Sequence, residues 1–188
     1  MTQPSSQDQP AGKAPEDYAE DARTLDAYAF RERHGNGFFI YDGSRPLRLP
    51  GDAKKMLLKS EQQVTMDFRA PMRARGSHVV IPVRKSDRSP VGGFISVGRT
   101  RNNDVVLADE SVSRFHALIV SGDDGQFSVS DAGSTNGTYV DDKEIPSARE
   151  SAKRELLRSG AKVRFGHVDL LFLDAAGLRE LAKRQAAR

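Results

Sequence analysis

The sequence predicts an all-β sandwich. Short runs of β-branched and aromatic residues recur along residues 78–174, and turn-forming residues separate them. Two runs alternate apolar and polar positions, as a strand with one buried face requires: Phe127 and Val129 alternate with serines, and Val163 and Phe165 alternate with basic residues. Many short strands at this spacing are typical of two packed sheets.

The runs place the expected strands in order along the chain. Pro82 lies within one of them and favours an edge strand, because proline has no N–H group to donate to a neighbouring strand. Asn136-Gly137 and Ser159-Gly160 mark turns. The expected strands are Phe38–Tyr41, His78–Val83, Phe94–Val97, Val105–Leu107, Ala117–Val120, Phe127–Val129, Tyr139–Val140, Val163–Phe165 and Val168–Leu173.

The two ends of the chain have other patterns. Apolar residues at helical spacing predict a helix over residues 16–32, which Gly35 ends. Asp42-Gly43 predicts a hairpin to a strand at 46–49, and residues 52–75 fit helix or strand equally well. Asp174 is a candidate N-cap for a short C-terminal helix. The expected organisation is a disordered tail at 1–15, a helix-plus-hairpin extension at 16–75, the sandwich at 76–174 and a helix at 175–188.

The composition excludes cysteine chemistry and a membrane-spanning helix. The chain has no cysteine, which removes disulfides and thiolate chemistry, and no apolar run reaches the length that spans a bilayer. The N-terminus does not have the pattern of a signal peptide, so we expect a cytoplasmic protein without membrane contact. The net charge is +3, but residues 45–88 carry eleven basic and four acidic side chains, and residues 89–145 carry four and nine.

Three loops of the expected sandwich hold polar residues that suit an anion. The fork of N–H groups on an arginine matches phosphate oxygens. A serine hydroxyl and backbone N–H groups add neutral donors, glycine allows close backbone approach, and asparagine can both donate to and accept from a peptide backbone. The loops are Val97-Gly98-Arg99-Thr100, Ser111-Val112-Ser113-Arg114-Phe115-His116 and Gly133-Ser134-Thr135-Asn136-Gly137-Thr138.

These segments, in this order and spacing, resemble the signature of forkhead-associated (FHA) domains. The intervening Asn103–Leu107 and the later Val163–Gly166 resemble it too. The resemblance covers about residues 78–174. It implies a sandwich of about eleven strands that binds phosphothreonine peptides through the loops at one end.

The resemblance also implies a role for each loop residue. Arg99 and Ser113 would contact the phosphate, with Arg114 as a second basic contact. Asn136 would hydrogen-bond the peptide backbone, and Thr135 would line the pocket. Three more residues would be scaffold: Gly98, His116 and Gly137.

We therefore expect a phosphothreonine-dependent interaction module in Ser/Thr kinase signalling, whose partner is a phosphothreonine-containing protein, either the kinase or its substrate. Catalytic residues and cofactors are not expected, because the sequence has no phosphate-binding glycine loop, no HExxH motif and no nucleophile elbow. Metals are not expected, because Asp123-Asp124 and Asp141-Asp142 fit hairpin turns better than metal ligation. One alternative is a scaffold of the same fold that binds without phosphate. Another is accessory nucleic-acid binding through residues 45–88, which the lack of an RNA-binding motif disfavours.

Overall fold

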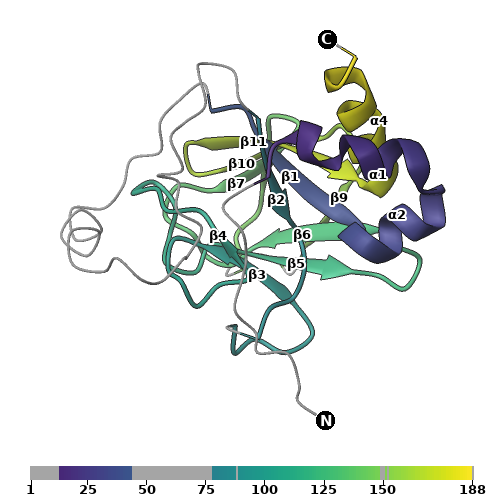
Figure 1. The fold of residues 1–188 in the computed structure, drawn as a ribbon. Helices are drawn as coiled ribbons and strands as arrows, with labels where there is room; N and C mark the ends of the chain where they lie inside the picture. The colour runs from purple at the N-terminus through teal and green to yellow at the C-terminus, as the bar shows by residue number, and fades with distance from the viewer. Residues whose placement is uncertain (1–12, 44–77, 88, 149–150, 152, 188) are drawn as a thin grey trace, which may run out of the picture.

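The fold of the chain is a sandwich of two β-sheets, which confirms the predicted fold class (Figure 1). A computed structural model describes residues 13–43, 78–87, 89–148, 151 and 153–187. The six-stranded sheet has the order β2 (Val79–Pro82), β1 (Gly37–Tyr41), β11 (Val168–Asp174), β10 (Lys162–Phe165), β7 (Thr138–Val140) and β8 (Lys143–Ile145). The five-stranded sheet has the order β4 (Val105–Val106), β3 (Ile95–Gly98), β5 (Ala117–Ser121), β6 (Phe127–Asp131) and β9 (Glu155–Leu157).

The core between the sheets follows the alternation in the sequence. Phe127 and Val129 of β6 are buried, and Val163 and Phe165 of β10 meet them from the other sheet. Aromatic rings fill the centre, with centroids 5.7 Å apart for Phe39 and Phe165. Edge-to-face packing of this kind adds to the stabilisation from burial.

Strand β1 lies inside the six-stranded sheet, although it precedes the predicted sandwich in the sequence. It pairs antiparallel with β2 on one side and β11 on the other, so that Phe39 stands opposite Ile81 and Phe172. All five residues of β1 are buried. Phe39 faces the sandwich core, whereas Phe38 belongs to a second cluster under the helices. This burial on both faces explains why the strand reads as a continuous apolar run.

The predicted single helix over 16–32 is wrong, because the chain breaks there into three pieces. A 3₁₀ turn η1 (Pro15–Tyr18) leads into α1 (Ala19–Thr24), and α2 (Ala27–His34) follows. Leu25 is extended, and the Asp26 side chain accepts a hydrogen bond from the Ala29 N–H and starts α2 anew. An aspartate that caps a helix cannot also continue the preceding one, and this local preference outweighed the helical spacing.

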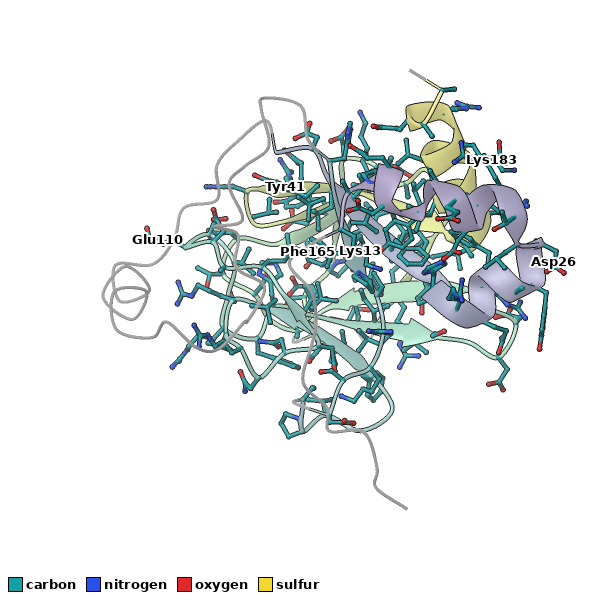
Figure 2. The ribbon with its side chains drawn as sticks, in the orientation of Figure 1. Lys13, Asp26, Tyr41, Glu110, Phe165 and Lys183 are labelled. Carbon is teal, nitrogen blue, oxygen red and sulfur yellow. The ribbon has the colours of Figure 1, made fainter. Side chains whose placement is uncertain are left out.

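The C-terminal helix α4 (Ala175–Gln185) begins as predicted, because the Asp174 carboxylate accepts from the Gly177 N–H. It packs on η1, α1 and α2, and together these helices cover the outer face of β1, β2 and β11. Figure 2 shows Asp26 and Lys183 on this helical side, Phe165 inside the sandwich and Glu110 on the opposite side, among the loops.

The remaining expectations from the sequence concern the edge strands and the segments outside the sandwich. β2 is an edge strand, as Pro82 suggested. Strands β8 and β9 went unpredicted, since each has three residues with one buried side chain. Several expectations fall on residues that lie outside the described ranges: the tail at 1–12, the strand at 46–49, the ambiguous stretch at 52–75 and most of the basic block at 45–88. Lys13, which was expected in the tail, forms a β-bridge with Val80. In the described part of the chain, no helix combines the length and apolar character needed to span a membrane.

The position of β1 generates a stability prediction. Phe39→Ala should lower the free energy of unfolding by about 3–5 kcal/mol, because it leaves a cavity between the sheets. Tyr28→Ala is the matched control, since that side chain is 65% exposed. The control should stay within about 0.5 kcal/mol of the parent protein in urea unfolding followed by circular dichroism. Equal stability of the two variants would show that β1 is not part of the core.

Candidate functional site

The first loop leaves β3 at Gly98 and is fixed against the second loop by the backbone. The Arg99 N–H donates to the Ser113 carbonyl at 2.9 Å. A Cβ on Gly98 would lie 2.7 Å from the Asn103 amide nitrogen and closer still to the Arg114 carbonyl oxygen. Glycine is therefore needed here for space.

Asn103 completes this junction. Its amide nitrogen donates to the carbonyl oxygens of Thr100 and Arg114, both at 2.8 Å, and its side chain is buried. The Thr100 hydroxyl donates to the same Arg114 carbonyl at 2.9 Å. The backbone of Arg114 is thereby held in place, while its side chain stays exposed.

His116 joins the second loop to the third. Its Nδ1 accepts from the Ser113 N–H at 3.0 Å, so Nε2 carries the proton and donates to the Gly137 carbonyl at 3.1 Å. The ring is fully buried and meets Phe165 edge-on, with centroids 5.7 Å apart. Burial lowers the pKa of His116, although the Gly137 hydrogen bond and the charge of Asp131 oppose the shift.

Ser113 makes a second, direct connection between the two loops. Its hydroxyl oxygen accepts from the Thr135 N–H at 3.0 Å and lies 3.4 Å from the Thr135 hydroxyl. The Asn136 amide nitrogen donates to the Ser111 carbonyl at 2.8 Å. Gly137 follows with φ +75°, which favours glycine. The structure therefore brings together all five residues expected to bind and the three expected as scaffold.

The two arginines of the site keep their charges available. Arg99 makes one long side-chain contact, 3.4 Å from Nη1 to the Glu110 carbonyl. Within the described ranges, neither Arg99 nor Arg114 forms an ion pair. In the part of the chain that the structure describes, both guanidinium groups therefore remain available to an anionic ligand.

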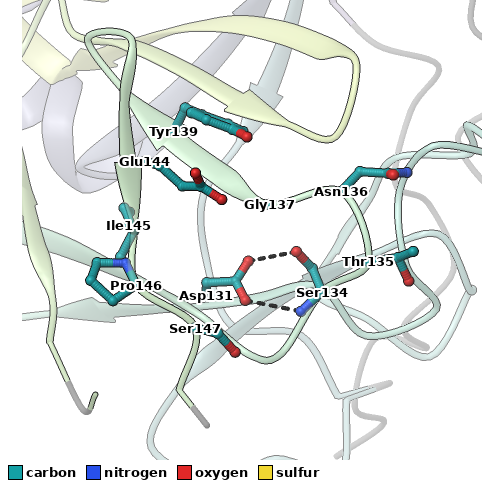
Figure 3. A pocket seen from close by; sticks show the side chains of 10 residues that line it. All are labelled: Asp131, Ser134, Thr135, Asn136, Gly137, Tyr139, Glu144, Ile145, Pro146 and Ser147. Atoms are coloured by element: carbon teal, nitrogen blue, oxygen red, sulfur yellow. Dashed lines mark hydrogen bonds between the residues drawn. The ribbon is translucent and has the colours of Figure 1, made fainter. Parts of the chain in front are cut away.

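Sequence reasoning missed Asp131, which organises the third loop. Its buried carboxylate accepts from the N–H groups of Gly133 and Ser134 and from the hydroxyls of Ser134 and Thr138, at 2.6–2.9 Å. Figure 3 shows the two hydrogen bonds from Ser134. Burial alone would raise the pKa of Asp131, but these hydrogen bonds outweigh it and hold that pKa below its usual value. An aspartate two residues before a Gly-Ser pair is a turn signal that could have identified it.

The paired aspartates behave as turn residues. Asp141 and Asp142 both have positive φ, 49° and 64°, and connect β7 to β8. Asp124 accepts from the Gln126 N–H in the turn between β5 and β6. Among the residues that the structure describes, no three histidine or acidic side chains gather as a metal site would require.

The buried neutral His116 predicts a pH-dependent stability. Its folded pKa lies below that of an unfolded histidine, about 6.5, so the unfolded chain binds more protons once the pH falls below that value. We expect the free energy of unfolding to decrease between about pH 7 and about pH 5.5 in urea titrations.

His34 provides the control for this prediction, because burial lowers its pKa as well. His34→Gln should remove only part of the pH dependence, and His116→Gln should remove more. A dependence that disappears entirely in His34→Gln would contradict the assignment to His116.

Comparisons with known proteins agree with this architecture. The sequence model of the FHA domain matches residues 95–166. The chain is 40% identical over 79 residues to an oxoglutarate dehydrogenase inhibitor of Corynebacterium diphtheriae, a match that covers 42% of this chain and 50% of that protein. It is also 40% identical over 78 residues to the glycogen accumulation regulator GarA of Mycolicibacterium smegmatis, covering 42% and 44%. The match spans about half the length of these curated relatives.

Among solved structures, the chain is similar to the FHA-2 domain of a Mycobacterium tuberculosis ABC transporter. The two are 31% identical, and the match covers 52% of this chain and 82% of that domain, with a TM-score of 0.37. The matched segment 95–166 runs from β3 to the end of β10 and includes all three loops of the candidate site. Residues 95–166 of the chain therefore form an FHA domain.

Proposed function

We propose that the chain binds proteins that carry phosphothreonine, and that Arg99, Ser113, Arg114, Thr135 and Asn136 form the binding site. The observation that supports this most directly is the pair of guanidinium groups, Arg99 and Arg114, which form no ion pair with any described residue and lie on loops already fixed to one another. A phosphorylated threonine carries a charge of about −1.5 to −2 and three strong acceptor oxygens, which such groups complement.

The neutral groups of the site support a peptide ligand. The amide nitrogen of Asn136 is already engaged with Ser111, and its Oδ1 has no partner among the described residues. That oxygen can accept a backbone N–H of a bound peptide. Because Ser113, Thr135 and His116 already hold the loops together, little conformational entropy would be lost on binding.

The relatives suggest the kind of protein this is. Two of them are named as an inhibitor and a regulator, and neither name describes an enzyme. We infer by analogy that this chain acts through binding and that a Ser/Thr protein kinase creates its ligand. Its partner would be the kinase or a substrate of that kinase.

A library experiment tests the proposal. The full chain is titrated with a degenerate peptide library centred on phosphothreonine and with the same library centred on threonine, by fluorescence anisotropy. Binding only to the phosphorylated library supports the proposal. Equal binding to both would identify a scaffold that does not depend on phosphate.

Removal of the Arg99 charge should weaken phosphopeptide binding. A hydrogen bond with a charged partner contributes about 1.5–3 kcal/mol, so Arg99→Ala should raise Kd by roughly tenfold to a hundredfold or more in titration calorimetry. Ser113→Ala should raise it less, because a neutral donor is lost. Arg184→Ala, an exposed arginine on α4, is the control and should leave Kd unchanged. If Arg99→Ala binds like the parent protein, the proposed phosphate contact is wrong.

A further inference from the structure

A second pocket adjoins the proposed phosphothreonine site on the other side of the third loop. Its volume is about 630 Å³, and it lies between that loop and the β7–β8 hairpin (Figure 3). Thr135 and Asn136 line it at the loop, and Tyr139, Glu144, Ile145 and Pro146 line it from the hairpin and the residue after it. A peptide held at Asn136 would therefore pass the mouth of this pocket.

The charge of the pocket is negative. Two carboxylates, Asp131 and Glu144, belong to its lining, which contains no lysine, arginine or histidine. Asp131 is saturated by its four hydrogen bonds. Glu144 is exposed, and its carboxylate has no hydrogen bond or ion pair with any residue that the structure describes. Glu144 is thus the group that remains available to a ligand.

The hairpin fixes Glu144 next to an aromatic ring. Tyr139 and Glu144 are cross-strand partners in the β7–β8 pair, which the tight turn at Asp141-Asp142 closes. Arg164 lies over the Tyr139 ring, 4.0 Å from its centroid, and fixes the ring in place. The hairpin also packs closely against the third loop at Gly137. A Cβ on Gly137 would lie only 3.0 Å from Glu144 Oε1 and 3.1 Å from the Tyr139 hydroxyl.

The rest of the lining suits the stem of a long side chain. Pro146 is partly exposed and supplies apolar surface beside the carboxylate, whereas the Ile145 side chain is buried in the core. Lysine and arginine side chains place their methylene groups on such surface while the charged end reaches a partner. The Glu144 carboxylate also complements a cation. The Tyr139 ring already contacts Arg164, so Glu144 is the group that would attract the charged end of the ligand side chain. An acidic ligand side chain would be repelled by Glu144.

We infer that this pocket receives a lysine or arginine side chain of the phosphorylated partner, from a position close in sequence to the phosphothreonine. The inference rests on the proposed function, because the phosphate anchors the peptide. The partner segment would then carry charges of both signs, with its phosphate at Arg99 and Arg114 and its basic residue at Glu144. The contact with Glu144 would then select among phosphothreonine peptides of different sequence.

A positional scan tests the inference. A phosphothreonine peptide with uncharged flanking residues is compared with versions that carry one arginine at each position in turn on either side of the phosphothreonine. We expect arginine at one or two positions to lower Kd roughly two- to fivefold, the range of an exposed ion pair. The gain should shrink as salt is added, because salt screens exposed charges.

Glu144→Gln is the decisive variant. It should bind the phosphopeptide with uncharged flanking residues like the parent protein and lose the preference for arginine. Glu180→Gln, an exposed carboxylate on α4, is the matched control and should retain the preference. Thermal unfolding of each variant checks that the fold is intact.

The outcomes separate the two proposals. Phosphopeptides that bind with no preference for arginine at any position overturn the inference and leave the phosphothreonine site standing. A preference that persists in Glu144→Gln also overturns it, because the cation then binds elsewhere. If no phosphothreonine peptide binds the parent protein, the proposed function fails and this inference fails with it.

Discussion

The two hydrogen bonds of the His116 ring connect the second and third loops to each other and to the core of the sandwich. One ring nitrogen accepts from the Ser113 N–H and the other donates to the Gly137 carbonyl, while the ring itself packs on Phe165 in the core. The geometry of the exposed loops is thereby tied to the interior of the sandwich. Both hydrogen bonds require the neutral imidazole with its proton on Nε2, which is the form that burial favours.

Two buried carboxylates also stabilise the loops of the site by accepting hydrogen bonds. Asp131 orders the third loop, and Asp104 orders the approach to the first loop by accepting from the backbone N–H groups of Ser86 and Ser96 and pairing with Lys85 at 3.1 Å. Burial alone would raise the pKa of Asp104, yet these donors lower it overall. An ionised buried group is costly unless it is fully hydrogen-bonded, so each aspartate strongly favours one loop conformation. The loops that carry Arg99 and Arg114 are thus held in one conformation by buried carboxylates as well as by His116.

The fold could be predicted from the sequence where apolar residues carry the pattern. The alternation in β6 and β10 and the cap at Asp174 are local features, and they identified the sandwich and the start of α4. The loop residues were recognised because their types and order resemble a family signature. The buried aspartates were missed, because an acidic residue in a polar segment is read as exposed until its donors are placed in space. The break at Leu25 and the strands β8 and β9 depend on capping and pairing that periodicity does not report.

The pairing of β1 with β2 has a consequence for how this chain folds. Tyr41 stands directly opposite Val79, although the two residues are far apart in the sequence. Strands that are distant in the sequence pair more slowly than the strands of a local hairpin, because the entropy of bringing the two segments together is lost before their contacts form. The edge of the six-stranded sheet therefore depends on a contact that neither segment can make by itself.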